Sequence, residues 1–270
     1  DETYCIETMM GDKKALQAGT SHYLGQNFSK AFDVRFQTKD NKEDFVYATS
    51  WGVSTRLIGA LIMVHGDDQG LRLPPNIAPI QVVIIPVINK NYNEDKFNSY
   101  TRTLINDLKA KGIRYHIDNR DQYSIGYKFN EWEMKGVPLR IEVGPRDIEN
   151  NELVIVRRDN NIKDNVSISE ASLQIENYLK DIQNNLFKQA KKFMVENTFS
   201  VSDYSEFKTK ISDGGFIKCG WDGLMDTETK IKDETKATIR CILFEQNISN
   251  VKCIYSGKPA KFEVIFSKAY

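Results

Sequence analysis

Apolar and polar positions divide the chain into three stretches with different spacing. Residues 4–8 predict a short strand, and residues 32–36 alternate apolar with polar side chains, which is typical of a half-buried strand. Residues 45–48 predict a return strand and therefore a hairpin. The small and polar residues 19–22 are expected to interrupt this sheet pattern. Residues 57–64 are then continuously apolar, which predicts a helix that is buried on every side.

A second pattern begins after a pair of consecutive prolines, which neither a helix nor a central strand tolerates. Residues 81–86 form a β-branched run, as in a strand that is buried on both faces. An amphipathic helix follows at 93–111 with Gly112 at its C-terminal end, and then a strand at 113–117. A strand, a helix and a strand in this order predict a parallel crossover unit.

Further elements complete the second stretch and make up the third. We expect helices at 123–135, from Ser167 to about Asn197, at 203–212 and at 227–236, and strands at 138–143, 152–156, 216–219, 239–244 and 262–266. The predicted fold class is α+β. It comprises an antiparallel sheet portion at 1–76, an α/β domain at 77–198 and a small α+β domain at 199–270.

Composition excludes few functions. The 270 residues carry 37 basic and 37 acidic side chains, so that any nucleic-acid contact has to come from a local patch. No signal peptide is recognisable and no apolar run is long enough for a bilayer, so we expect a cytoplasmic protein without membrane contact. Four cysteines without a C-x-x-C pair indicate reduced thiols.

The residues around the apolar run suggest ligand chemistry. Arg56 stands at the start of the predicted helix, where a cation needs a compensating anion. It is either a surface arginine or a guanidinium that holds a phosphate or a purine ring. His22 is likewise either a core histidine or a ligand contact. His65 and His116 have no metal-ligand spacing, so we expect no metal at them.

Several short segments resemble class II prolyl-tRNA synthetase of the eukaryotic and archaeal type. They read QAGTSH at 17–22, LGQNF at 24–28, SWGVSTR at 50–56, MVHGDD at 63–68, KFN at 128–130, KGVP at 135–138 and EVGPRD at 142–147. The resemblance extends to Tyr270, which matches a chain end that folds back toward the active site. Of the family's three catalytic motifs only the third is present, so we expect the C-terminal half of a synthetase.

The resemblance implies a site that joins proline to ATP. The residues that it assigns to ATP are Gln17, Thr20, Ser54 and Arg56, and those that it assigns to proline are His22, Ser50, Trp51 and Gly52. The reaction is an attack of the proline carboxylate on the α-phosphate, which depends on positioning and charge rather than on a protein nucleophile. No catalytic residue is therefore predicted, and the expected cofactor is ATP with Mg²⁺.

The second domain resembles an anticodon-binding module, in which Phe129, Glu133 and Arg140 would read anticodon bases. Phenylalanine can stack on an unpaired base, glutamate accepts from amino groups, and arginine donates a forked pair to guanine. The alternative is that Phe129 belongs to the core and Glu133 to a surface ion pair. Candidates for phosphate contact are Lys128, Lys135, Arg157, Arg158 and Lys163.

The third domain departs from the family pattern. Relatives carry four zinc cysteines there, of which Cys219 and Cys253 match the first and the third. The other two positions hold Leu224 and Tyr255. A closed structural site needs four ligands, so we predict a degenerate site without zinc. Cys241 is expected in the core.

The resulting hypothesis is a proline–tRNA ligase whose partners are L-proline, ATP, tRNA(Pro) and a second copy in a homodimer. A threonyl- or glycyl-type class II synthetase is one alternative, but Trp51 and His22 argue against it. A catalytically inactive, synthetase-like tRNA-binding accessory protein is the other. Retention of the predicted ATP residues argues against this second alternative.

Overall fold

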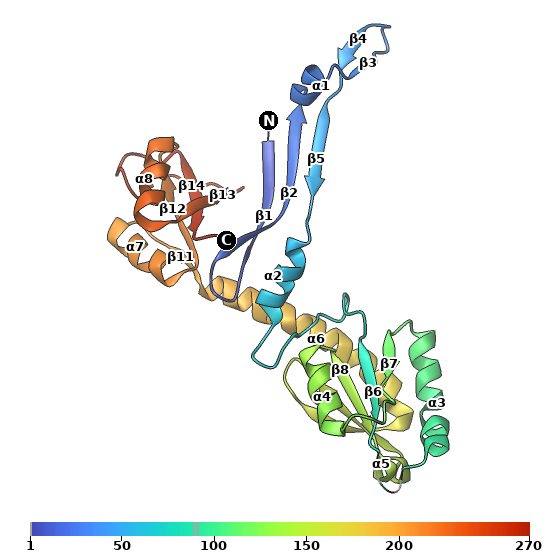
Figure 1. Cartoon of the computed structure of the whole chain (residues 1–270). Coiled ribbons are helices and arrows are strands. Elements are labelled where there is room, and N and C mark those ends of the chain that lie inside the picture. The colour runs from blue at the N-terminus through green and yellow to red at the C-terminus, as the bar shows by residue number, and fades with distance from the viewer. Residues whose placement is uncertain (1, 89, 91) are drawn as a thin grey trace. The chain divides into compact units, whose positions relative to one another are not determined.

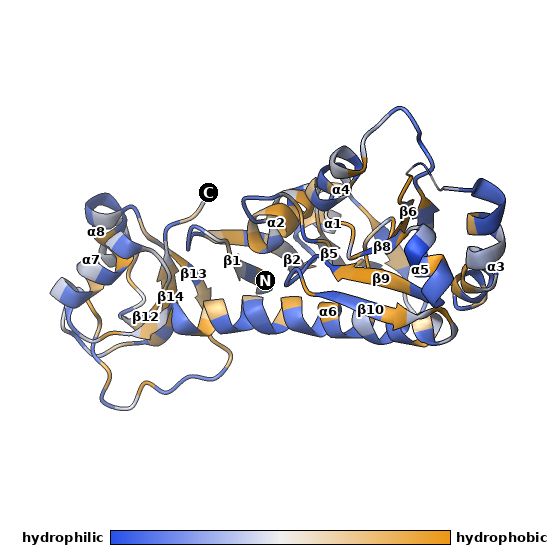
Figure 2. Cartoon of the chain, turned by 90° about the horizontal axis from the view of Figure 1, so that it is seen from below, coloured by the Kyte–Doolittle hydropathy of each residue, from blue (hydrophilic) through white to orange (hydrophobic). Residues whose placement is uncertain are grey.

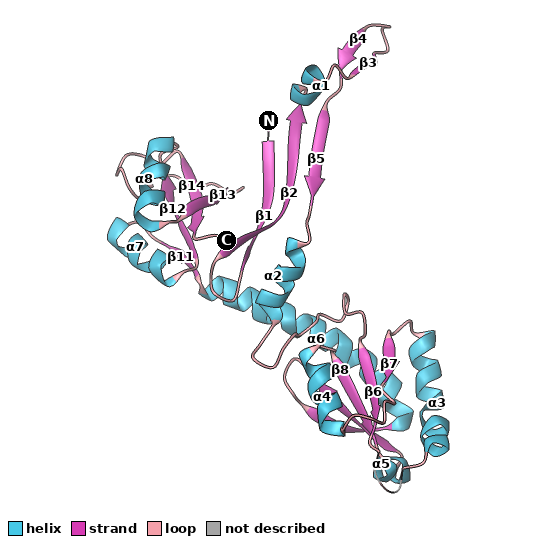
Figure 3. Cartoon of the chain, viewed as in Figure 1, coloured by secondary structure: helices cyan, strands magenta, loops and turns pink. Residues whose placement is uncertain are grey.

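The computed structural model describes residues 2–88, 90 and 92–270 (Figures 1 and 3). The predicted segments 1–76 and 77–198 include residues 1, 89 and 91, which lie outside the described residues. The chain forms two compact units: one combines the residues up to Val64 with Lys192–Tyr270, and the other is His65–Lys191. The functional division into three domains stays a prediction. Within the described residues, none of the helices combines the length and the apolar character needed to cross a bilayer.

The first unit contains an antiparallel sheet of β1 (Glu2–Met9), β2 (Ala15–Gly25) and β5 (Ala48–Gly52), in the order β1-β2-β5. Strand β2 continues through residues 19–22, so the predicted interruption is wrong. These small and polar residues remain extended because β1 and β5 satisfy their backbone groups from both sides. The predicted hairpin is confirmed by β3 (Arg35–Gln37) and β4 (Glu43–Phe45), and a short helix α1 (Asn27–Ala31) precedes it.

The apolar run forms the helix α2 (Arg56–His65), but the prediction that it is buried on every side is wrong. Its inner face packs Ala60 against Met10 and Leu16. The side chains of Ile58 and Ile62 are 61% and 44% exposed. In the described part of the chain, the outer face of α2 is therefore open to solvent.

A second sheet in the first unit has the order β11-β12-β14-β13. Its strands are β11 (Thr198–Ser200), β12 (Phe216–Trp221), β13 (Thr238–Ile242) and β14 (Phe262–Ser267), and its helices are α7 (Tyr204–Asp213) and α8 (Met225–Thr235). The Asp203 carboxylate caps α7 by accepting from the backbone N–H of Glu206 at 2.9 Å. Phe207, Ile217 and Phe266 are fully buried in the core between helices and sheet.

The second unit is built on a five-stranded sheet with the order β10-β9-β8-β6-β7. The strands are β6 (Val82–Pro86), β7 (Tyr115–Ile117), β8 (Leu139–Val143), β9 (Glu152–Arg157) and β10 (Lys163–Ser167). Strand β6 pairs in parallel with β7 and β8, which confirms the predicted crossover. Figure 2 shows β6 and β9 mainly in the hydrophobic colour. The polar strand β10 was missed because its sequence lacks a hydrophobic signal.

Helices cover both faces of this sheet. Helices α3 (Glu94–Ala110) and α6 (Ile168–Glu196) pack on the side chains of Val82 and Ile84. Helix α4 (Ile125–Met134) packs through Trp132 on Val83 and Ile85, which point to the opposite face because side chains alternate along a strand. The short helix α5 (Pro145–Asn150) follows β8. Helix α4, which carries Phe129 and Glu133, thus has one face of the sheet beneath it.

The turn after α4 requires glycine at position 136. Its φ is +73°, and a Cβ there would lie 2.6 Å from the backbone carbon of Leu71. We expect Gly136→Ala to lower the free energy of unfolding by about 2 kcal/mol, because backbone strain and overlap add. Gly112→Ala is the matched control: its φ is +67°, nothing lies within 4 Å of the added Cβ, and only about 1 kcal/mol is expected. Urea unfolding of the two variants measures the difference, and equal losses would contradict the close approach.

Candidate functional site

The register of the first sheet gathers the predicted nucleotide and proline residues. On β2 and β5, Thr20 pairs with Gly52 and His22 pairs with Ser50. Directly opposed residues share a face of the sheet. A register shift at Ile6/Glu7 returns Gln17 to this face, because Gln17 pairs with Glu7 one step beyond the bulge. Residues from two separate segments therefore meet on one surface.

Arg56 begins α2 beside this surface. Its Nη1 donates to the carbonyl oxygen of Gln17 at 3.3 Å, and its backbone N–H donates to the Ser54 hydroxyl at 3.3 Å. The guanidinium thus reaches back over β2 toward the face that carries His22. The His22 ring is fixed by a hydrogen bond between Nδ1 and the Thr3 hydroxyl at 3.0 Å.

These residues line one open pocket of about 330 Å³. All eight residues predicted for ATP and proline belong to its lining: Gln17, Thr20, His22, Ser50, Trp51, Gly52, Ser54 and Arg56. The remaining lining residues are Ala18, Gly19 and Val53, so the described lining contains a cation and no carboxylate. A pocket of this kind favours an anionic ligand.

Trp51 occupies a different position from the other predicted proline residues. It pairs with Ser21, so its side chain belongs to the face opposite to that of His22 and Ser50. It also lines an apolar pocket of about 410 Å³ on that opposite face, together with Tyr4 and Ile6. Its side chain is 81% exposed. The structure therefore does not bring the Trp51 ring onto the same face as His22.

The chain end lies against the start of β2, in line with the predicted return toward the active site. Ala15 donates its N–H to the carbonyl oxygen of Lys268 at 2.8 Å and forms a bridge with Ala269. The Nζ of Lys14 lies 4.8 Å from the centroid of the Tyr270 ring. A hydrogen bond to Asp12 raises the pKa of Tyr270 to about 12. These contacts hold the terminus two residues before Gln17.

The predicted base-reading residues also come together, on α4 and β8. The Arg140 guanidinium lies 4.2 Å from the centroid of the Phe129 ring. Glu133 is one turn beyond Phe129, and both Glu133 and Arg140 line a small pocket of about 20 Å³. The Glu133 carboxylate has no side-chain partner within the described residues. This arrangement presents a ring, a free acceptor and a cation, but the pocket itself has room only for about one water.

Glu142 is a member of this cluster that the sequence interpretation missed. Its carboxylate accepts from Arg140 Nε at 3.1 Å and from Lys163 Nζ at 2.7 Å, and the residue is 5% exposed. The signal was the spacing Arg-x-Glu on a strand, which puts both side chains on one face. Glu142 therefore holds the Arg140 guanidinium over the Phe129 ring.

Three of the five candidates for phosphate contact are buried, so that this prediction is wrong for them. Lys128, Arg157 and Arg158 are 1%, 9% and 6% exposed. Each is engaged inside the protein by an aspartate: Asp118, Asp159 and Asp67 respectively. The side chains of Lys135 and Lys163 are 48% and 57% exposed and remain available to a phosphate.

The two cysteines of the predicted degenerate zinc site are neighbours in the third region. Cys219 lies on β12, and Cys253 forms a β-bridge with Gly220, the residue after Cys219. Both thiols are buried, and burial raises the pKa of Cys219 to about 12. Leu224 is exposed at the start of α8. No cluster of three or more potential metal ligands occurs among the described residues. The absence of zinc stays a prediction.

Comparison with known families identifies two domains. Residues 81–178 match the family described as "Anticodon binding domain", and residues 204–270 match "Prolyl-tRNA synthetase, C-terminal". The first match contains all of β6 to β10 and the residues Phe129, Glu133 and Arg140. The second contains α7, α8 and the sheet strands from β12 to β14.

Whole-chain relatives agree with these domains. The chain is 51% identical over 269 residues to a proline–tRNA ligase of Porphyromonas gingivalis and 49% identical over 273 residues to one of Bacteroides fragilis. A proline–tRNA ligase of Cytophaga hutchinsonii is 50% identical over 271 residues. Each alignment covers 100% of this chain and 55% of the relative, so the chain spans about half the length of the curated relatives that it matches. Residues 204–270 thus belong to the family of prolyl-tRNA synthetase C-terminal domains, and over its full length the chain is similar to proline–tRNA ligases.

Proposed function

We propose that the chain forms part of an enzyme that activates L-proline with ATP and transfers it to tRNA(Pro). The observation that carries this proposal is the pocket on the first sheet, whose lining combines residues of two segments and contains the cation Arg56 beside His22 and Ser50. The names of the relatives, proline–tRNA ligase, support the choice of amino acid. A homodimer in the cytoplasm belongs to the same proposal.

In this proposal the pocket binds the nucleotide through Arg56. The guanidinium can stack on a purine and at the same time donate a forked pair to a phosphate. Gln17, Thr20 and Ser54 supply hydrogen-bonding groups around it. The described lining offers no carboxylate for Mg²⁺, so the ion would arrive on the phosphates of ATP. His22 and Ser50, which oppose one another across two strands, would hold the proline ring.

Activation then requires little covalent chemistry from the protein. The proline carboxylate attacks the α-phosphate, a phosphorus–oxygen bond forms, and pyrophosphate leaves. The contribution of the chain is to hold the two reactants in line and to balance the negative charge that accumulates on the phosphates. The tRNA would be selected by Phe129, Glu133 and Arg140 in the second unit.

Amino-acid-dependent exchange of pyrophosphate into ATP tests this function in a protein of the relatives' full length that carries this chain. We expect exchange with proline and at least 100-fold less with threonine or glycine, since threonine would place a polar, branched side chain in the proline pocket and glycine lacks the ring that the pocket would contact. Exchange with threonine or glycine instead of proline would support the alternative synthetase types. No exchange with any amino acid would support a tRNA-binding accessory protein.

A further inference from the structure

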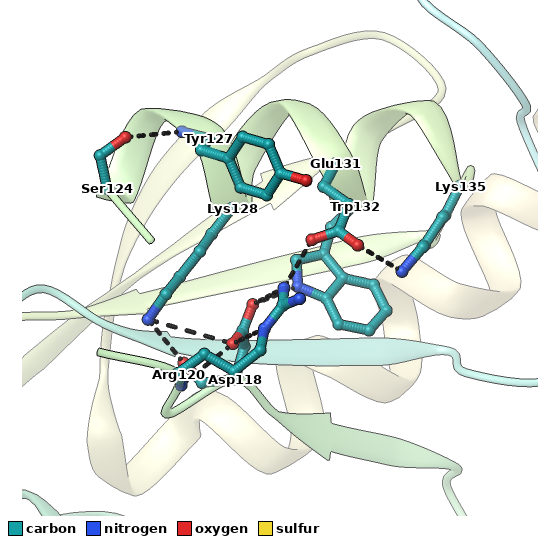
Figure 4. Close-up of polar contacts among 8 residues, drawn as sticks. All are labelled: Asp118, Arg120, Ser124, Tyr127, Lys128, Glu131, Trp132 and Lys135. Atoms are coloured by element: carbon teal, nitrogen blue, oxygen red, sulfur yellow. Dashed lines mark hydrogen bonds and ion pairs between the residues drawn. The ribbon is translucent and has the colours of Figure 1, made fainter. Parts of the chain in front are cut away.

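A buried cluster of charges lies beneath α4, between this helix and the end of β7 (Figure 4). Asp118 follows β7 and is 0% exposed, and Lys128 on α4 is 1% exposed. Trp132 Nε1 donates to Asp118 Oδ2 at 2.7 Å, and Lys128 Nζ donates to the carbonyl oxygen of Asp118 at 3.2 Å. Lys128 and Trp132, which lie one turn apart on α4, thus both bind to the single residue that follows β7.

Arg120, which precedes α4, connects Asp118 to a further residue of that helix, Glu131. Its Nε and Nη2 donate to the two Asp118 oxygens at 2.8 Å and 2.7 Å, and Nη2 also donates to Glu131 Oε2 at 2.5 Å. Glu131 accepts in turn from Lys135 Nζ at 2.7 Å. Burial by itself raises the pKa of Asp118, but the hydrogen bonds from Arg120 and Trp132 outweigh burial and hold the pKa well below its usual range. The Asp118 carboxylate is therefore a charged acceptor for α4.

The rotation of α4 about its axis follows from these bonds. Lys128 and Trp132 are four residues apart and share one face of the helix. Phe129 and Glu133 each follow one of them, so this second pair lies about 100° further around the helix. Fixing the first pair on Asp118 therefore fixes the direction of the second pair. The apolar contacts of Trp132 and Phe129 with Val83 and Ile85 turn one side of α4 toward the sheet. The hydrogen bonds to Asp118 are directional and set the rotation more narrowly.

We propose that Asp118 is a positioning residue for base reading, one that orients Phe129 and Glu133 through Lys128 and Trp132. The inference rests on the proposed anticodon function of those two residues. It gives the buried Lys128 a structural role in place of the predicted phosphate contact. It also explains why a buried acid lies beneath α4 and accepts from the indole N–H of Trp132, where apolar side chains alone would fill the space.

The test is a mutant cycle on tRNA binding by the 270-residue chain at one fixed salt concentration. The probes are a tRNA(Pro) transcript and the same transcript with its anticodon bases replaced. We expect Phe129→Ala and Glu133→Gln to weaken binding of the first transcript about 10- to 100-fold. Asp118→Asn should weaken it about 10-fold and reduce the preference over the second transcript. In the Phe129→Ala/Glu133→Gln background, Asp118→Asn should change binding less than twofold.

Leu108→Ala is the control for lost stability alone. Leu108 is fully buried in α3 on the opposite face of the sheet, so this variant should keep the preference for the intact anticodon. Trp132→Phe removes one hydrogen bond to Asp118 and keeps an aromatic, though smaller, side chain, and it replaces Asp118→Asn should the latter fail to fold.

The outcomes separate the two proposals. If Phe129→Ala and Glu133→Gln lower the preference while Asp118→Asn and Trp132→Phe leave it intact, the positioning role is wrong and the anticodon site stands. The positioning role is also contradicted if Asp118→Asn weakens tRNA binding by the same factor in the Phe129→Ala/Glu133→Gln variant as in the wild type. If Phe129→Ala and Glu133→Gln leave the preference unchanged, the proposed anticodon site itself fails.

Discussion

Replacing Arg56 with alanine is expected to reduce proline-dependent pyrophosphate exchange by about 100- to 1,000-fold, as loss of a preorganised charge donor does in other sites. The reason is that Arg56 is the sole charged residue in the described lining of the pocket. Its Nη1 already bonds the Gln17 carbonyl, so the guanidinium is held in place before the nucleotide binds. The measurement is kcat/KM for ATP in a protein of the relatives' full length.

Two further substitutions frame this result. Arg56→Lys keeps the charge but loses the planar fork, so we expect it to recover only a small part of the loss. Arg35→Ala is the matched control, because Arg35 lies in the exposed hairpin and pairs with Asp33 at 2.6 Å, away from the pocket lining. It should leave exchange within twofold. Equal activity of Arg56→Ala and Arg35→Ala would remove the basis for a nucleotide site here.

Elements whose stability depends on local pattern could be predicted from the sequence. The run at 81–86 became the fully buried strand β6, and the amphipathic segment at 93–111 became α3 with Asn93 as its cap. Strand β7 then paired in parallel with β6. For α3 the apolar spacing, the cap Asn93 and the glycine after its end all favour a helix. For β6 the β-branched run favours a strand buried on both faces.

Features that depend on what covers an element could not be predicted in the same way. The apolar residues of α2 favour burial on every side, yet Ile58 and Ile62 are exposed. The sequence shows that Ile58 and Ile62 are apolar, but it does not show whether another part of the protein packs on them. Residues 19–22 show the converse case, because pairing with β1 and β5 overrides their weak strand preference.

In the candidate site, too, features set by short local segments could be predicted, whereas features set by strand pairing or packing could not. Short segments predicted that Gln17, His22 and Arg56 would meet, and they line one pocket. The direction of the Trp51 side chain depended on strand register, which no local segment specifies. Lys128 was interpreted as a surface cation because lysine is usually exposed. Its burial depends on Asp118, which is ten residues away in sequence and directly follows β7.

A second buried ion pair secures the C-terminal end of α4. Arg158 donates to both Asp67 oxygens, at 2.5 Å and 2.8 Å, and to the carbonyl oxygen of Glu133 at 3.0 Å. The Arg158 side chain is 4% exposed, whereas that of Asp67 is 33% exposed. The hydrogen bond from Arg158 lowers the pKa of Asp67 to about 2. The pair thus joins the segment after α2 to the residue that carries the proposed base acceptor.

Asp67→Asn is expected to lower the free energy of unfolding of the second unit by about 3 kcal/mol at pH 7, because the guanidinium of Arg158 then remains buried without a counter-charge. The Asp67 pKa is about 2 in the folded chain against an ordinary value of 3.8. A depressed folded pKa gives stability that is complete above the unfolded value and is lost as the pH falls through the folded value. The difference between wild type and variant should therefore persist down to about pH 4 and shrink toward pH 2.

Amide hydrogen exchange in the buried strands β6 and β8 measures this difference for the second unit by itself. Asp33→Asn is the control for an exposed pair, since Asp33 pairs with Arg35 at the surface of the first unit; its cost, read from amide exchange in β2 and β5 of that unit, should be less than about 1 kcal/mol. Added salt should reduce the small effect of Asp33→Asn but leave the effect of Asp67→Asn nearly unchanged, because a pair around a buried guanidinium is poorly screened. A loss at Asp67 that salt abolishes, or that does not shrink in acid, would mean that the pair acts as an ordinary surface contact rather than as the anchor of α4.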